Sequence, residues 1–170
     1  VHWLLQAMRA LLEIACPSVL MKAEAIMPTH QLPPYFGMGE TPGPECHLAY
    51  HSSMMAASWV ALAEENVSIL NAVIEKTPAV PTGSSWLTYV RCHDDIGWNV
   101  LKPEVESLGD AQHQRLLQAS HFFAGLTTNS YAQGASFQTT DLKKAHGTNG
   151  MASALVGMSS ASNADELHRA

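Results

Sequence analysis

Apolar side chains recur at helical spacing through the first fifteen residues, at Leu4, Leu5, Met8, Leu11, Leu12 and Ala15. Residues 1–15 are therefore predicted to form an amphipathic helix that ends before Pro17. The next stretch, 18–26, is an almost continuous apolar run and is predicted to be a parallel strand. Residues 27–45 contain five prolines and three glycines, which predicts a loop with one short turn near residues 34–36.

The remaining pattern alternates between strand and helix signals. Residues 47–50 are predicted to form a short strand, followed by one long helix over 52–76 that Ser52 or Ser53 caps. Aromatic and β-branched residues from Trp86 to Cys92 predict a third strand, a buried one, behind a Pro/Gly/Ser turn. Further helices are predicted over residues 111–125 and 148–158, separated by a polar segment. This alternation is typical of an α/β fold.

Length and charge narrow the class of protein. The chain has 170 residues, fewer than the roughly 250 of a complete (β/α)8 barrel. It begins with Val1 in an apparent mid-helix pattern, so we expect a piece of a larger protein. The net charge is −6 without a basic run, and nucleic acid and anionic membrane are therefore unsuitable partners. Three cysteines without a Cys-x-x-Cys pair favour free thiols in a reducing, cytoplasmic compartment.

Ionisable residues follow two of the predicted strands. The strand that starts at Trp86 ends in His93, Asp94 and Asp95, and Glu24 lies near the end of the strand over residues 18–26. In a parallel sheet or barrel both carboxylates would point into the same cleft, where active sites gather. Two carboxylates with different surroundings are what glycosidic-bond chemistry requires. The alternative is structural: Glu24 pairs with Lys22 or is a solvated rim residue.

Two segments carry a resemblance to a known family. Lys22-Ala23-Glu24-Ala25-Ile26 and Val90-Arg91-Cys92-His93-Asp94-Asp95-Ile96-Gly97-Trp98 resemble signature regions of the α-amylase family of glycoside hydrolases, and in detail its amylosucrase branch. The resemblance implies an α/β fold that is an incomplete (β/α)8 TIM barrel, from its fifth strand onward. It divides the chain into a partial barrel over 1–96, an irregular helical insertion over 97–147 after the strand-seven site, and a truncated barrel helix over 148–170.

The resemblance also implies roles for individual residues. Glu24 would be the general acid/base, and Asp94 would stabilise the transition state. His93 would bind the same sugar, and Asp95 would close the pocket. Trp98 is expected to line the sugar pocket, because aromatic faces suit such ligands; the alternative is a core position. No cofactor and no metal is expected, with a cation at His93, Asp94 and Asp95 as the weaker alternative.

One element of the family pattern is missing from this chain. The family's nucleophile is an Asp in an Arg-x-Asp setting, and no such triplet occurs here. The segment alone is therefore expected to be inactive and aggregation-prone, with the missing barrel half of the same parent chain as its partner. The predicted parent is an α-retaining glucosyltransferase or hydrolase acting on sucrose or an α-glucan. The alternatives are a plain α-glucan hydrolase, an isomerising relative, and a non-catalytic scaffold remnant.

Overall fold

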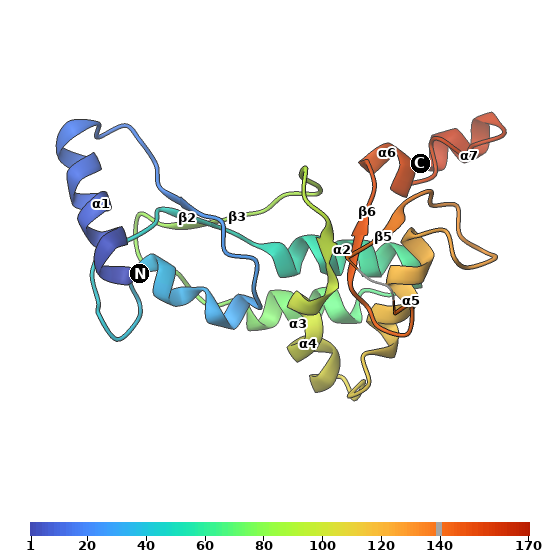
Figure 1. Cartoon of the computed structure of the whole chain (residues 1–170), viewed down its shortest axis with the longest axis horizontal. Helices are drawn as coiled ribbons and strands as arrows, with labels where there is room; N and C mark the ends of the chain where they lie inside the picture. Colours follow the sequence, from blue (N-terminus) through green and yellow to red (C-terminus); the bar gives the residue numbers. More distant parts are fainter. Residues whose placement is uncertain (139–140) are drawn as a thin grey trace.

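The computed structural model describes residues 1–138 and 141–170, as an elongated molecule with its termini far apart (Figure 1). Helix α1 (His2–Ala15) and a small sheet lie at one end, where α1 confirms the helix predicted over residues 1–15. Helices α2 (Ser52–Glu64) and α3 (Ser68–Lys76) run side by side through the middle. A second sheet and the C-terminal helices form the other end.

The sheet beside α1 is parallel and confirms an α/β arrangement. Its strands β1 (Lys22–Ala23), β2 (Leu48–Tyr50) and β3 (Ser85–Leu87) are ordered β1-β2-β3. Each strand has only two or three paired residues, so the ladders are shorter than the predicted apolar runs. The loop between β1 and β2 contains the predicted turn as a 3₁₀ helix, Pro33–Phe36, preceded by another, Thr29–Gln31.

The single helix predicted over residues 52–76 is wrong, because the structure has two helices there. Glu65 adopts a left-handed conformation with φ of 51° and ends α2. Asn66 then turns its side chain back, and its Oδ1 accepts the backbone N–H of Ser68 at 2.8 Å. This side-chain hydrogen bond offers the backbone an alternative to a continuous helix. The hydrophobic period continues across the break, which is why the pattern did not reveal it.

The predicted serine cap of α2 is also wrong, since His51 is the capping residue. Its Nδ1 accepts the backbone N–H of Met54 at 3.2 Å. Ser52 and Ser53 lie inside the first turn, and the Ser53 hydroxyl donates to the carbonyl of Val100 at 3.1 Å. A histidine nitrogen thus accepts the backbone hydrogen bond that a serine oxygen usually accepts at the start of a helix.

An antiparallel sheet occupies a part of the chain for which no strand was predicted. Strands β4 (Ile96–Gly97), β5 (Ala135–Phe137) and β6 (Gly147–Asn149) are ordered β4-β6-β5. The helix predicted over residues 148–158 is present only in part: Thr148 belongs to β6, and α6 covers Ala152–Leu155 alone. A 3₁₀ helix (Trp98–Leu101), α4 (Lys102–Ser107), α5 (Gln114–Phe123) and α7 (Ala164–Arg169) complete this part.

The larger hydrophobic core joins buried residues of α2, α3 and α5 with residues in and around the second sheet. Trp59 meets Phe123 edge-on at 5.2 Å between ring centroids, and Trp98 stacks on Phe123 at 6.0 Å. Buried members extend from Met55 to Leu155, so this core spans the boundaries predicted after residues 96 and 147. The division into three parts stays a prediction. A smaller core lies against the parallel sheet and comprises Met21, Ala23, Phe36, Cys46 and Ala49.

The described residues form neither a closed barrel nor a helix that could span a membrane. Their strands form two sheets of three strands each, and these sheets do not close into a barrel. Across 1–138 and 141–170, none of the helices combines the length and the apolar character needed to cross a bilayer.

We expect His51 to make the stability of the protein that carries this chain dependent on pH. Because Nδ1 accepts from Met54, the ring proton lies on Nε2 and donates to Thr77 Oγ1 at 2.8 Å. Burial lowers the pKa of His51 below its ordinary 6.5. A second proton would occupy Nδ1 and remove the cap, so the unfolded state binds that proton more tightly. The free energy of unfolding should be constant above about pH 7 and fall below about pH 6.5, by roughly 1 kcal/mol.

Urea unfolding between pH 5 and 8 measures this dependence. His51→Asn keeps an oxygen acceptor without a titrating ring, so its profile should be flatter than that of the wild type. His168→Asn, at an exposed histidine of α7, is the matched control and should retain the wild-type slope. Parallel profiles for wild type and His51→Asn would rule out the protonation of this cap as the cause.

Candidate active site

The ends of two strands bring three ionisable side chains together. Glu24 directly follows β1, while His93 and Asp94 lie in the loop between β3 and β4. One ligand atom from each of the three lies within 4.8 Å of the other two. The structure thus places Glu24, His93 and Asp94 in one cluster, as expected for residues that follow two parallel strands of the same sheet.

The cluster is open to solvent. The side chain of His93 is 84% exposed and that of Asp94 is 46% exposed, with His93 Nε2 3.4 Å from Asp94 Oδ1. A ligand can therefore reach both carboxylates. The oxygen and nitrogen atoms of the same three side chains could coordinate a divalent cation. Asp95 is not part of this set.

A cavity of about 350 Å³ adjoins the cluster and is lined by Glu24, Asp94 and Asp95. Two polar residues that sequence reasoning did not assign to the site, Ser52 and Tyr89, line it as well. Their hydroxyl oxygens lie 3.2 Å apart, and burial raises the pKa of Tyr89, so the phenol stays protonated at neutral pH. The sequence did not assign these two residues to the site, because Ser52 lies where a helix cap is expected and Tyr89 lies inside a predicted buried strand.

Lys22 does not make the ion pair with Glu24 that was one of the two structural alternatives; the other, a solvated rim residue, agrees with the exposed side chain of Glu24. Its ammonium donates a hydrogen bond to the Tyr50 hydroxyl and lies 4.2 Å from the centroid of that ring. This hydrogen bond is the main cause of the raised pKa of Lys22, and the charge of Glu24 adds a smaller contribution. In the part of the chain that the structure describes, Lys22 and Glu24 form no ion pair within 4.0 Å.

Arg91 holds the loop that carries His93 and Asp94. Its guanidinium donates to the backbone carbonyls of Cys92 at 2.7 Å and of Gly150 at 3.0 Å, and also to that of Asp94. These bonds satisfy carbonyl groups that the irregular loop leaves without ladder partners. Arg91 therefore connects the loop to the chain just after β6.

Asp95 lies against the backbone of the second sheet. A Cβ built on Gly147 would overlap the Asp95 carboxylate, so a larger residue at position 147 would displace that side chain. Gly147 pairs with Gly97 across the ladder between β4 and β6. The antiparallel sheet thus fixes one wall of the cavity.

The structure does not bring Trp98 to the cluster. Its side chain is fully buried, and its Nε1 donates to Thr148 Oγ1 at 2.9 Å. With one ring face stacked near Phe123, the indole presents no open face to a sugar. The core position, the alternative considered for this residue, is the one that the structure shows.

The chain is similar to three groups of curated enzymes, although no protein-family model matches it. It is 28% identical over 103 residues to trehalose synthase/amylase TreS of Mycobacterium tuberculosis (strain CDC 1551 / Oshkosh), covering 61% of this chain and 17% of that enzyme. For trehalose synthase of Pimelobacter sp. (strain R48) the identity is 28%, covering 61% and 19%. For glucosylglycerate phosphorylase of Escherichia coli (strain K12) it is 26%, covering 63% and 19%.

These relatives are enzymes of the α-amylase family, whose members are built on a TIM barrel. The similarity therefore supports the resemblance at the level of the family, without singling out the amylosucrase branch. The chain spans less than a fifth of the length of each of these relatives.

Gly147→Ala is expected to destabilise the site by forcing the new methyl group into the Asp95 carboxylate. Because that carboxylate is the far end of a side chain and can swing aside, the free energy of unfolding should fall by about 1 kcal/mol, the low end for overpacking, which denaturant titration measures. Gly97→Ala is the matched control, because a Cβ there meets only Ile26 at 4.0 Å, an ordinary contact. Equal stability of the two variants would show that Asp95 does not depend on the backbone of β6.

Proposed function

We propose that this chain supplies the acid/base and the transition-state-stabilising carboxylates of an α-amylase-type glycosidase or transglycosidase that acts on α-glucosides. The observation that carries the proposal is the meeting of Glu24 and Asp94, from separate strand ends, beside His93 and a cavity of about 350 Å³. The similarity to trehalose synthases and to a glucosylglycerate phosphorylase supports the same class of chemistry.

Each residue has a distinct task in the proposed reaction. Glu24 protonates the glycosidic oxygen as the bond to the leaving group breaks, and later removes a proton from the attacking acceptor. Asp94 stabilises the oxocarbenium-like transition state through the hydroxyl groups of the same sugar, which His93 and Asp95 hold in place. The attacking nucleophile comes from another part of the protein, because this chain contains no Arg-x-Asp triplet.

Sucrose is the proposed donor and an α-glucan chain the proposed product. The run Asp94-Asp95-Ile96-Gly97-Trp98, which resembles the amylosucrase branch, supports this choice. A second candidate is the isomerisation of an α-linked disaccharide, and it is favoured by the names of the trehalose synthases among the relatives. The free thiols of Cys16, Cys46 and Cys92 suit the proposed cytoplasmic location.

Product analysis with the full-length protein separates these candidates. Release of fructose from sucrose together with growth of an α-glucan supports the proposed donor. Conversion of maltose to trehalose, without fructose release from sucrose, favours isomerisation. Release of glucose alone from α-glucans identifies a plain hydrolase. Absence of turnover with every donor leaves only the non-catalytic scaffold.

Glu24→Gln tests the proposed acid/base role in the same full-length protein. With an ordinary glycosidic leaving group, kcat/KM should fall by about 10²–10⁴, because the departing oxygen then receives no proton. With α-glucosyl fluoride the loss should be far smaller, since fluoride departs without protonation and kcat/KM reports the bond-breaking half of the reaction. Glu75→Gln, at an exposed position of α3, is the control and should leave both values unchanged.

The comparison of the two donors makes the result specific. Equal losses with both donors would indicate a structural role for Glu24, and near-normal turnover of the ordinary donor would remove it from the mechanism.

A further inference from the structure

A second cavity lies where the 3₁₀ helix Trp98–Leu101, the first turns of α5 and the segment 143–146 meet. It has a volume of about 340 Å³, at the lower end of the range of small-molecule sites. Its lining shares no residue with the cavity beside Glu24 and Asp94. It is therefore a separate feature of the molecule, and a ligand bound there would not depend on the proposed reaction.

The ionisable side chains that line this cavity are all cationic or able to become so. They are three lysines and two histidines, Lys102, His113, Lys143, Lys144 and His146, and none of the described lining residues is acidic. The whole chain has nine Lys and Arg residues against fifteen Asp and Glu residues. A third of its Lys and Arg side chains thus gather at one cavity, against the negative balance of the chain.

Two of these lysines keep their charge without a carboxylate partner. In the part of the chain that the structure describes, neither Lys102 nor Lys143 makes an ion pair within 4.0 Å. The third, Lys144, is only loosely paired, with its Nζ 3.7 Å from Asp141 Oδ2. An anion in the cavity can therefore gain from charges that the protein itself leaves uncompensated.

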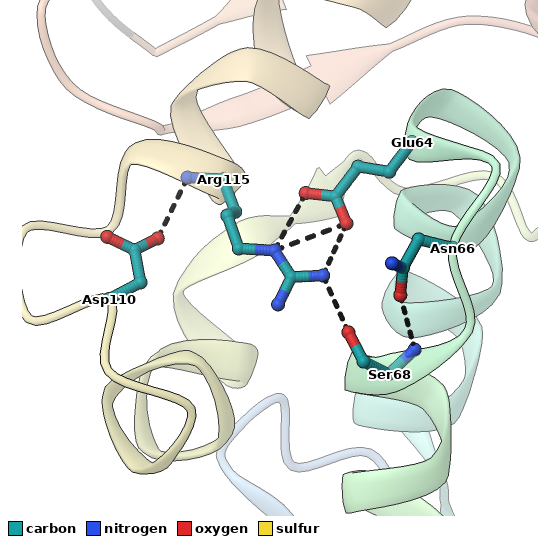
Figure 2. Close-up of polar contacts among 5 residues, drawn as sticks. All are labelled: Glu64, Asn66, Ser68, Asp110 and Arg115. Atoms are coloured by element: carbon teal, nitrogen blue, oxygen red, sulfur yellow. Dashed lines mark hydrogen bonds and ion pairs between the residues drawn. The ribbon is translucent and has the colours of Figure 1, made fainter.

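The other charges near the start of α5 are already compensated. His113 Nε2 lies 2.6 Å from Glu106 Oε1, and Arg115 Nη2 donates to Glu64 Oε2 at 2.5 Å (Figure 2). The Asp110 carboxylate accepts the backbone N–H group of Arg115 at 2.8 Å and so occupies the first turn of the helix (Figure 2). An anion would therefore be held by the lysine side chains, and not by Arg115 or by the N-terminus of α5.

The segment that carries Lys143 and Lys144 is fastened beside α5. His121 Nε2, on this helix, donates to the backbone carbonyl of Leu142 at 2.7 Å. Asp141 Oδ1 accepts the backbone N–H group of Lys143 at 3.0 Å. These two hydrogen bonds set the course of the backbone directly before the two lysines, so their side chains reach the cavity from a held segment.

Apolar and neutral polar groups complete the lining. Leu116, Leu117 and Ala145 contribute apolar surface, and Leu116 is fully buried. Charges in a hollow with such low-dielectric walls attract an oppositely charged ligand more strongly than the same charges on a flat surface. Asn99 and Gln112 add side-chain amides, which can donate to ligand oxygens that the ammonium groups leave free.

We propose that this cavity, the lysine cavity, binds a small phosphate-bearing anion. A phosphate group carries close to two negative charges at neutral pH and three strong acceptor oxygens, which matches the two uncompensated lysines. A single carboxylate carries one charge and would leave one of them without a partner. Ammonium groups bind phosphate as point charges, so Lys102 and Lys143 need no fixed bidentate geometry.

Titration calorimetry of the full-length protein with inorganic phosphate and with glycerol 2-phosphate, at constant ionic strength, tests the proposal. At least one of the two should bind saturably, with a dissociation constant at or below about 1 mM. Tighter binding of inorganic phosphate would identify the free ion as the ligand, and tighter binding of the ester would identify an organic phosphate. Absence of saturable binding of both overturns the proposal.

Three variants show whether the lysine cavity is the site. Lys143→Gln should raise the dissociation constant about tenfold, because it removes one charge-assisted hydrogen bond, whereas Lys143→Arg should bind nearly as the wild type does. Lys143 is exposed, so the unfolding midpoint should not change. Lys76→Gln, at an exposed position of α3 outside the cavity, removes the same charge and should leave the affinity unchanged. Equal weakening by Lys143→Gln and Lys76→Gln overturns the proposal, since affinity would then follow net charge alone.

Hydrogen–deuterium exchange places the bound anion without any need for turnover. Phosphate should slow exchange over residues 99–117 and 141–146, and Lys143→Gln should reduce this protection. Such protection in a protein that turns over no α-glucoside supports the lysine cavity and leaves only the proposed function refuted. Protection confined to residues 22–26 and 92–95 overturns the lysine cavity, because the anion would then occupy the candidate active site.

Discussion

The parallel pairing of β1, β2 and β3 is the constraint on which the candidate site depends. Lys22 pairs with Leu48, and Ala49 pairs with Trp86, so the carboxyl ends of β1 and β3 lie on the same side of the sheet. Glu24 follows β1 at that side, and the loop that carries Asp94 follows β3 there. Only two or three paired residues in each strand set this alignment. Arg91 reinforces it by donating hydrogen bonds to the carbonyl of Cys92 in the loop and to that of Gly150 just after β6.

The local hydrophobic pattern was sufficient to predict α1, the parallel strands and the meeting of Glu24 with His93 and Asp94. It failed where structure depends on distant partners. Strand β4 pairs with β6 through Ile96 and Thr148, two positions that no local period connects. The ring of Trp98 is needed for the core beside Phe123, and residue type alone does not separate that role from sugar binding.

The errors at α2 have a different origin, because single polar side chains determine where this helix begins and ends. Asn66 interrupts the helix with one hydrogen bond to Ser68, although the apolar positions on either side keep the same period. His51 takes the place of a serine cap, and its ring also reaches Thr77, directly after α3. One imidazole therefore fixes the start of α2 and connects it to the end of the following helix, a double role that spacing in the sequence does not disclose.

Helix α2 has different surroundings at its two ends. Ser52 in its first turn lines the cavity beside Glu24, and Glu64 in its last turn pairs with Arg115 of α5. A helix of 13 residues spans about 20 Å and does not stretch, so it keeps these two contacts at a fixed separation. A change at the Glu64–Arg115 pair would therefore reach the cavity only as a movement of α2 as a whole, which makes this helix a rigid rod between α5 and the cavity.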